Sequence, residues 1–418
     1  MTYRSRVRLR RRSHEQGGRL ALGATCVAVA MLPLVTPRGP GNAAPVDGLI
    51  VVAIVVSLLW LASAARVLKW PFGIAVGLSV AAGALGAIVG PVPGNGAVAL
   101  FQDLTLFCWC VVVVNVAASP HATHTILKTW AACGTGWAMV LVLAVLSGNP
   151  AIAGVTARNG ARAALTFGDA NLAASYFFLS LMIVWAVQWP VRRAPRLIAY
   201  LLLVLALVMT GSNGGMFVLV LGAAVAGAVG VARRSGAIAG VAVAALFTAA
   251  AGASVLVVDP DAIQTKARAS SVPLIRDSIG RAADSVGDRE ALLSQTVDLY
   301  REHGGLGGGP RSTKATLTKL EAPFVKEAHN DYVAALTERG VLGVVALTLL
   351  VGSILYRVGK VGFGEPIGGF DGVVARPGAL VGAAVGTLTA ATFYEVLHFR
   401  HLWTLLALIA AVQIWGRR

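Results

Sequence analysis

Residues 334–357 read AALTERGVLGVVALTLLVGSILYR, an apolar run whose few charged residues stand near its two ends. About 20 mainly apolar residues are enough to cross a lipid bilayer as an α-helix. The polar sequence HNDY (329–332) comes directly before this run. The stretch therefore predicts a membrane-spanning helix that begins beside a group of polar side chains.

Similar apolar runs recur along the whole chain. Of its 418 residues, 56% are hydrophobic and 13% are charged, whereas a typical soluble protein has about 25% charged residues. The mean hydropathy is +0.74. This composition excludes a soluble globular enzyme, a disordered chain and a disulfide-rich scaffold.

We predict an all-α fold, a polytopic transmembrane helix bundle of about 12 spans. The runs assigned as spans are 19–36, 48–66, 71–91, 97–118, 129–147, 169–189, 196–210, 214–232, 236–258, 334–357, 377–395 and 400–416. Region 196–232 also allows a single interrupted element, because the polar tip TGSNGG (210–215) divides it.

The basic residues favour two spans in that region. If the Arg-rich N-terminus is cytoplasmic, every even-numbered loop carries Lys or Arg, as cytoplasmic loops do. Merging the two spans would place Arg233 and Arg234 outside. We therefore expect a multi-pass protein of the cell membrane with both termini in the cytoplasm.

The net charge of +16 follows the same pattern. Segment 259–328 holds 10 basic and 10 acidic residues, which leaves 25 basic and 9 acidic residues for the rest of the chain. The surplus of basic residues lies in short clusters between apolar runs rather than in one continuous basic stretch. This distribution argues against a nucleic-acid partner and indicates membrane lipids instead.

The longest hydrophilic segment divides the bundle. We expect a basic cytoplasmic tail (1–18), a bundle of about nine spans (19–258), an extracytoplasmic loop with short helices (259–333) and the last three spans (334–418). A loop of this length is usually functional rather than a simple connection. Residues 289–303 within it predict an amphipathic helix.

Polar residues gather where spans meet this outer loop. His329 and Arg289 flank a glycine-rich stretch, residues 304–309, which fits either an anion-binding nest or a flexible turn. Arg162 and Asn171 are expected at the same depth. Residues 395–401 include another group of polar side chains. Binding of the acceptor and a simple solvent-exposed rim explain this group equally well.

Four motifs resemble the O-antigen ligase and polysaccharide polymerase superfamily (Wzy type), in the order that this family shows. They are FGDANLA (167–173), TGSNG (210–214), Arg289 followed by GLG (305–307), and HNDY (329–332) followed by Leu336, Glu338, Gly340 and Gly343. The resemblance covers roughly residues 160–345. Two positions depart from it: Ala170 stands where the family usually has Pro, and Asn213 where it usually has Arg.

The resemblance implies a metal-independent glycosyltransferase without a cofactor, at the outer face of the membrane. Its donor would be a polyprenyl-pyrophosphate-linked glycan, and its acceptor a glycan, a lipid or a protein. Polymerase and ligase are both compatible with the motifs. A transporter or flippase of a lipid-linked oligosaccharide is the alternative, although no repeated halves are visible.

The chemistry of this transfer suggests roles for the matching residues. His329 suits a general base, because its ordinary pKa is close to neutral pH. Arg289 suits the leaving pyrophosphate, which a guanidinium binds with two charge-assisted hydrogen bonds. The substrate-binding candidates are Arg158, Arg162, Asn171, Asn213, Arg311, Asn330 and Glu338. Either Arg158, Arg162 or Arg311 replaces the cation that is missing at Asn213, or the donor is held in a different way.

Overall fold

The computed structural model describes residues 3–39, 43–63, 67–157, 160–257, 259–281, 294–296, 298, 300–301, 305–319 and 329–417. Within these ranges the chain is helical and forms no β-strand, apart from one isolated bridge between Pro366 and Arg417. The predicted all-α class is therefore confirmed.

Twelve long helices overlap the twelve predicted runs in the described part of the chain. They are α1 (Tyr3–Ala30), α2 (Pro45–Ser63), α3 (Gly73–Val89), α4 (Pro93–Val116), α5 (Pro120–Leu146), α7 (Ala170–Val187), α8 (Arg193–Met209), α9 (Asn213–Ser235), α10 (Ala237–Val257), α15 (Asp331–Phe363), α16 (Pro377–Ala390) and α17 (Arg400–Gly416). Six of them, α2, α4, α5, α7, α9 and α15, are long and apolar enough by themselves to cross a membrane. The number of spans stays a prediction.

Short helices connect the long ones. They are α6 (Pro150–Ala153), η2 (Leu165–Phe167), α11 (Pro260–Arg268), α12 (Pro273–Ser278), η3 (Ile279–Arg281) and α14 (Ser312–Lys319). The predicted amphipathic helix at 289–303 lies largely outside the described residues.

Side-chain caps fix where several helices begin. Asp169 accepts hydrogen bonds from two backbone N–H groups at the start of α7, and Asn330 does the same for α15. Ser212 caps α9 directly after Gly211, whose φ of 58° turns the chain between α8 and α9. Such caps satisfy N–H groups that have no partner within the helix. Region 196–232 therefore forms two helices.

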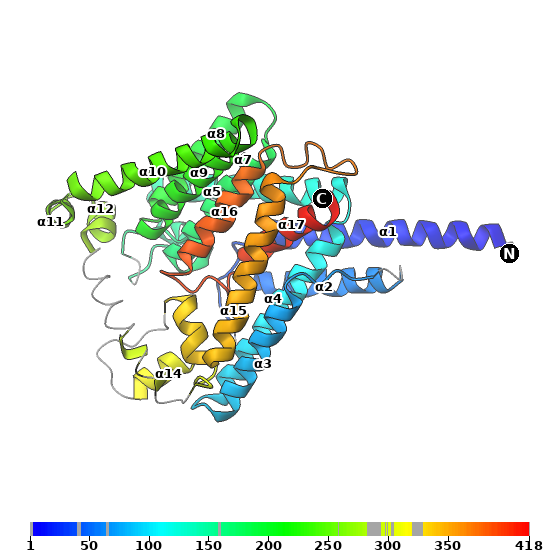
Figure 1. Ribbon diagram of the computed structural model, residues 1–418, viewed down its shortest axis with the longest axis horizontal. Helices are drawn as coiled ribbons and strands as arrows, with labels where there is room; N and C mark the ends of the chain where they lie inside the picture. Colours follow the sequence, from blue (N-terminus) through cyan, green and yellow to red (C-terminus); the bar gives the residue numbers. More distant parts are fainter. Residues whose placement is uncertain are drawn as a thin grey trace.

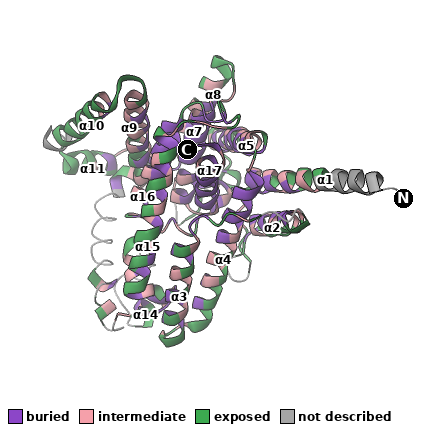
Figure 2. Ribbon diagram, turned by 45° about the vertical axis from the view of Figure 1, so that its right-hand side comes forward, coloured by how far each residue is buried: buried purple, intermediate pink, exposed green. Residues whose placement is uncertain are grey.

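Burial differs strongly between helices (Figure 2). In α7, Ala170–Val187, 89% of the residues are buried inside the protein. Most residues of α17 are buried as well. Two indole N–H groups help to join this core: Trp130 donates to Ser180 of α7 (3.0 Å), and Trp109 donates to Thr404 of α17 (2.9 Å). Helix α10 instead packs on α9 and leaves most of its apolar surface exposed.

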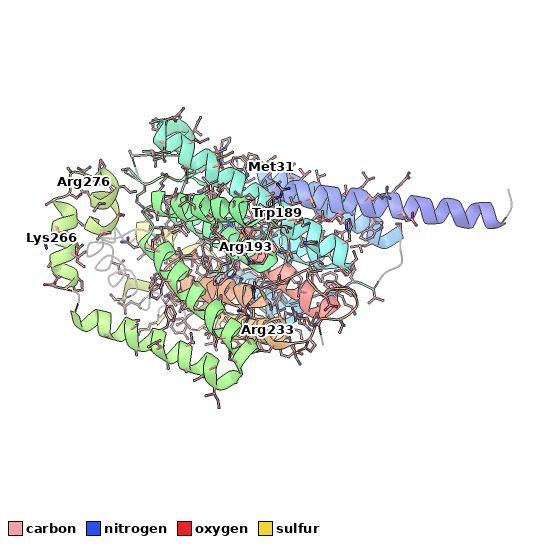
Figure 3. The ribbon with its side chains drawn as sticks, turned by 90° about the horizontal axis from the view of Figure 1, so that it is seen from above. Met31, Trp189, Arg193, Arg233, Lys266 and Arg276 are labelled. Atoms are coloured by element: carbon pink, nitrogen blue, oxygen red, sulfur yellow. The ribbon has the colours of Figure 1, made fainter. Side chains whose placement is uncertain are left out.

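Helix α1 begins far earlier than the apolar run at residue 19, because the helix includes most of the basic segment. Its N-terminal end projects away from the body of the protein (Figure 1). Lys266 of α11 and Arg276 of α12 lie at the opposite side of the molecule (Figure 3). Trp60 of α2 packs on α1, where Gly17 and Gly18 leave room for the indole ring.

Candidate functional site

The site end of the bundle is defined here as the end at which α7, α9, α15 and α17 begin. Arg162 lies there, in the segment before α7. Its guanidinium donates to the Asn171 Oδ1 atom (2.7 Å) and to the Thr210 carbonyl (3.0 Å). The Ser212 hydroxyl also donates to Asn171 (2.9 Å) and contacts the Tyr394 hydroxyl (3.2 Å). The predicted residues Arg162 and Asn171 are therefore directly joined.

A glycine makes the Tyr394 contact sterically feasible. A Cβ atom at Gly214 would lie 2.0 Å from the Tyr394 hydroxyl oxygen. The predicted residue Asn213 stands next to it, exposed, and its amide donates to the Ser278 carbonyl of α12 (3.3 Å). Asn213 therefore ties the tip between α8 and α9 to the outer segment. This position lacks the cation that the family usually has.

His329 lies just before α15 and is partly buried. Its backbone adopts a φ of 49°, a left-handed conformation that is uncommon outside glycine, although histidine is among the residues enriched there. The His329 backbone N–H donates to a Glu395 carboxylate oxygen (3.1 Å). Asn330 caps α15 through the N–H groups of Tyr332 (2.9 Å) and Val333 (3.2 Å). The structure thus gives Asn330 a definite part in starting the helix.

Glu338 and Arg311 form a second polar group. The Glu338 carboxylate accepts hydrogen bonds from the Arg311 backbone N–H (2.9 Å) and from the Thr313 hydroxyl (3.1 Å). The Arg311 guanidinium donates to the side chain of Gln102 on α4 (2.6 Å). These contacts join α4, α14 and α15, and they bring Arg311 and Glu338 together as neighbours.

The described glycines of the 304–309 stretch pack against a kink in α15. The N–H groups of Gly308 and Gly309 donate to the carbonyls of Thr337 and Glu338 (both 2.9 Å). Gly340 has a φ of 63°, and a Cβ there would lie 2.1 Å from the Gly305 carbonyl oxygen. Two N–H groups of this stretch therefore already have hydrogen-bond partners inside the protein.

An ion pair lies beside this kink. Arg339 donates to Asp103 of α4 (2.5 Å) and to the hydroxyl of Ser79 on α3 (2.5 Å). The Arg339 and Asp103 side chains are only 19% and 26% exposed. An otherwise apolar groove of about 280 Å³ runs past Arg339, between α3 and α15. It offers a surface on which an apolar chain could lie.

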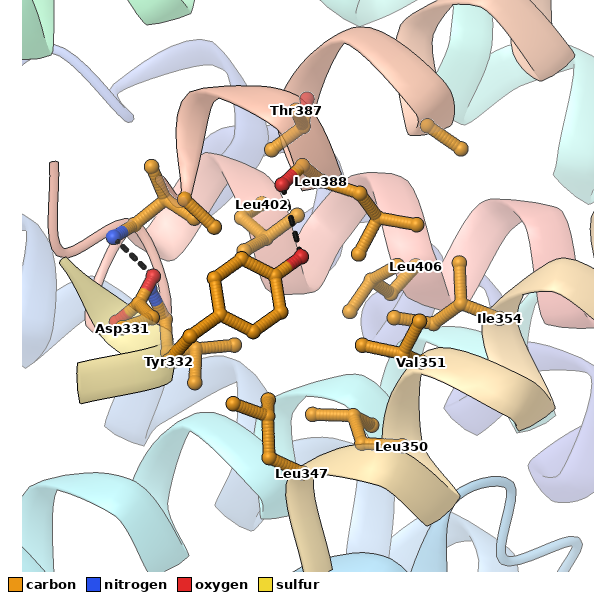
Figure 4. A pocket seen from close by; sticks show the side chains of 14 residues that line it. Asp331, Tyr332, Leu347, Leu350, Val351, Ile354, Thr387, Leu388, Leu402 and Leu406 are labelled. Carbon is orange, nitrogen blue, oxygen red and sulfur yellow. Dashed lines mark hydrogen bonds between the residues drawn. The ribbon is translucent and has the colours of Figure 1, made fainter. Parts of the chain in front are cut away.

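A second pocket lies under the start of α15, between α15, α16 and α17 (Figure 4). Tyr332 crosses it and donates its hydroxyl to the Leu388 carbonyl (3.0 Å). Leucine, isoleucine and valine side chains form most of its wall. Its free volume of about 20 Å³ holds roughly one water-sized group, so it offers no room for a lipid chain in this conformation.

The loop between α16 and α17, residues 391–399, adds side chains to the site end that were not among the predicted site residues. Asp331 is 5% exposed, and its carboxylate accepts from the N–H groups of Val396 (2.7 Å) and Leu397 (3.3 Å). Tyr394 and Glu395 of this loop make the contacts to Ser212 and His329 described above. The polar residues in 395–401 were a signal for this region, but their partners could not be read from the sequence.

His398, the last residue but one of this loop, has an exposed side chain. The surrounding protein nevertheless desolvates the imidazole, and the guanidinium groups of Arg400, Arg311 and Arg38 add to the effect; Asp169 opposes it. Together they lower the pKa of His398 to about 4. The imidazole is therefore neutral near pH 7.

Two predicted residues, Arg289 and Arg158, lie outside the described residues. The described part of the chain contains no group of three or more His, Cys, Asp and Glu residues arranged to hold a metal ion.

Comparison with known proteins gives one family. Residues 197–348 match the Wzy_C family, described as O-antigen ligase. The matched segment runs from α8 into α15 and includes the TGSNG tip and the HNDY sequence. A search of curated proteins finds no match. The family match confirms the resemblance seen in the motifs and, with the apolar helices, supports a multi-pass membrane enzyme of polysaccharide assembly.

Proposed function

We propose that this chain, which carries an O-antigen ligase domain over residues 197–348, transfers a glycan from a polyprenyl-pyrophosphate donor to an acceptor hydroxyl. The acceptor belongs to a glycan, a lipid or a protein. The reaction takes place at the outer face of the cell membrane and builds a cell-surface polysaccharide, by polymerisation or by ligation.

One observation carries this proposal. Tyr394 contacts Ser212 of the Arg162–Asn171 group, and the adjacent Glu395 accepts a hydrogen bond from His329. Two motifs that are far apart in the sequence therefore meet on one short loop. A cation near a titratable imidazole is what pyrophosphate departure and hydroxyl activation together require.

In the proposed reaction the acceptor hydroxyl oxygen bonds to the anomeric carbon of the donor sugar. The bond from that carbon to the pyrophosphate oxygen breaks, and the polyprenyl pyrophosphate leaves with the electron pair. His329 takes the proton from the attacking hydroxyl. Arg289 binds the pyrophosphate oxygens, whose negative charge increases as the bond breaks.

The other predicted residues are assigned to substrate binding. Arg162 and Asn171 would hold the second phosphate or the first sugar. Arg158 lies near Arg162 in the sequence, and Asn213 follows Ser212, whose hydroxyl donates to Asn171. Arg311 and Glu338 would stand on the other side, with Asn330 beside the base. The apolar groove along α3 and α15 would offer the polyprenyl chain an apolar surface.

The test is transfer from a polyprenyl-pyrophosphate glycan by the purified protein in detergent or nanodiscs. Wild type should transfer, and His329→Ala should lower turnover by about 10²–10⁴-fold while donor binding barely changes. His121→Ala, at the exposed start of α5, is the matched control. Normal transfer by His329→Ala would remove the base assignment. A flippase would give no transfer by wild type and movement of lipid-linked glycan across vesicles.

Metal independence is tested in the same assay. We expect transfer to continue in the presence of a chelator, because the proposed charge stabilisation comes from guanidinium groups. Loss of transfer on chelation, with recovery on adding magnesium or manganese, would reject this mechanism.

Orientation has a separate test in intact cells. In a background without the four native cysteines, Lys266→Cys should react with an impermeant thiol reagent from outside. Ala194→Cys and Ser235→Cys should not react. Labelling of residue 194 from outside would reverse the proposed topology.

A further inference from the structure

The loop at residues 391–399 is held firmly against the HNDY sequence. Four hydrogen bonds join the two segments: His329 N–H to Glu395 (3.1 Å), Asp331 N–H to the Ala391 carbonyl (2.9 Å), and the N–H groups of Val396 (2.7 Å) and Leu397 (3.3 Å) to Asp331. Because Asp331 is buried, the bonds that its carboxylate accepts are largely shielded from water. The backbone next to His398 therefore has a defined position relative to His329.

The same loop also reaches the Arg162–Asn171 group, through the contact between Tyr394 and Ser212. His398 follows four residues after Tyr394. Charged groups from separate elements act on its ring: Arg38 after α1, Asp169 before α7, Arg311 before α14 and Arg400 at the start of α17. His398 thus belongs to the loop that contacts both Ser212 and the backbone of His329.

His398 has the properties of a ligand-binding side chain. It is exposed to solvent, and the Phe399 ring packs edge-on against it, with ring centroids 4.7 Å apart. Arg400 is paired in a bidentate manner with Asp47 (2.6 and 2.5 Å), so its charge is balanced. A neutral imidazole has a ring nitrogen that accepts a hydrogen bond.

We propose that His398 is a further substrate-contacting residue of this site, where its imidazole accepts a hydrogen bond from a sugar hydroxyl. The hydroxyl belongs either to the donor glycan or to the acceptor. Glu395 and Asp331 are positioning residues that hold the loop. This inference rests on the proposed glycosyl transfer, and it extends the site beyond the segment that matches the family.

The experiment is steady-state transfer by the full-length protein, with the KM of donor and acceptor measured separately. His398→Ala should raise one KM about tenfold and leave kcat nearly unchanged, as expected for a lost hydrogen bond that is made equally in the ground and transition states. His398→Gln should recover part of the loss, because its amide oxygen also accepts a hydrogen bond. The KM that rises identifies the molecule that carries the hydroxyl.

His124→Ala on α5 is the matched control and should leave both KM values unchanged. If wild type transfers glycan and His398→Ala has unchanged kinetics, the inference is wrong while the proposed function stands. If Ala and Gln variants are equally impaired and both unfold at a lower temperature than wild type, His398 has a structural role and the inference is also wrong. A wild type that transfers no glycan overturns the proposed function itself.

Discussion

Arginines at the two ends of the bundle differ in the partners that most of them bind. At the end opposite the site, Arg233 donates to the Gly362 carbonyl (2.6 Å), Arg417 to the Gly364 carbonyl, and Arg196 to the Gln188 carbonyl (3.0 Å). These acceptors lie at or just after the last turns of α15 and α7. A cation there satisfies unpaired carbonyls and interacts favourably with the helix dipole.

At the site end, several arginines reach side chains of other segments, although Arg162 also donates to the Thr210 carbonyl. Arg162 reaches Asn171, Arg311 reaches Gln102, and Arg400 forms a bidentate pair with Asp47. Each contact joins segments that are distant in the sequence or on different elements. At the opposite end Arg357 likewise donates to a side chain, that of Gln413. Arginine count and net charge alone therefore do not identify a site, and the acceptors around each arginine have to be compared one by one.

The largest expected difference between the two ends concerns activity. Arg162→Ala should reduce kcat/KM for glycan transfer by about 10²-fold, because it removes a charged group from the proposed donor site. Arg162→Lys should recover only part of the lost kcat/KM, since an ammonium lacks the planar fork of a guanidinium. Arg196→Ala is the control at the opposite end. An equal loss in Arg196→Ala would show that the two ends do not differ in this way.

The Arg339–Asp103 pair should give the largest effect on stability. Arg339→Met leaves a largely buried carboxylate without its cation, which costs about 3–5 kcal/mol in comparable sites. Thermal unfolding in detergent measures the effect. The double variant Arg339→Met/Asp103→Leu should unfold at a higher temperature than Arg339→Met alone. If the double variant is the less stable, the pair is not what holds α15 to α4.

The kink in α15 gives a smaller and local effect. Gly340→Ala should lower stability by about 1–3 kcal/mol, because alanine is strained at positive φ and its Cβ would collide with the Gly305 carbonyl. Gly352→Ala lies in the same helix with open space around it. This control should be neutral or slightly stabilising, since alanine favours helix. Equal unfolding temperatures for the two variants would contradict the packing of the glycines on the kink.

The smallest effect is expected at the end opposite the site. Arg233→Ala should cost about 0.3–1 kcal/mol of stability, the usual contribution of a cation near a helix C-terminus. Glycan transfer at saturating substrate should remain at the wild-type level. A strong loss of transfer by a stable Arg233→Ala protein would extend the functional region through the whole bundle.

Hydrophobic runs predicted the helices well, because their length and spacing are local properties. Helix α17 begins at Arg400, as the run does, and α16 begins at Pro377. Helix α1 begins at Tyr3, before the span predicted from residue 19, because a basic segment without an apolar run gave no sign that the helix extends into it. The kink at Gly340 was not expected either, because it depends on packing against Gly305.

Motifs predicted part of the candidate site. Arg162 and Asn171 are joined, and Arg311 contacts Glu338, although the roles of these residues remain to be tested. Glu395 belongs to the polar group noted at 395–401, but the contacts of Tyr394 and Glu395 could not be predicted, because their partners are more than 60 residues away in the sequence. A single sequence carries no direct record of such contacts.

The loop at 391–399 lies after residue 348, where the O-antigen ligase domain ends. A chimaera that receives only residues 197–348 from a protein of the O-antigen ligase family would combine one protein's HNDY segment with a foreign loop. The bonds from Asp331 and His329 would then depend on whether the host loop presents a carboxylate and backbone N–H groups at the right register. Grafts aimed at changing glycan preference should therefore carry the α16–α17 loop together with the domain.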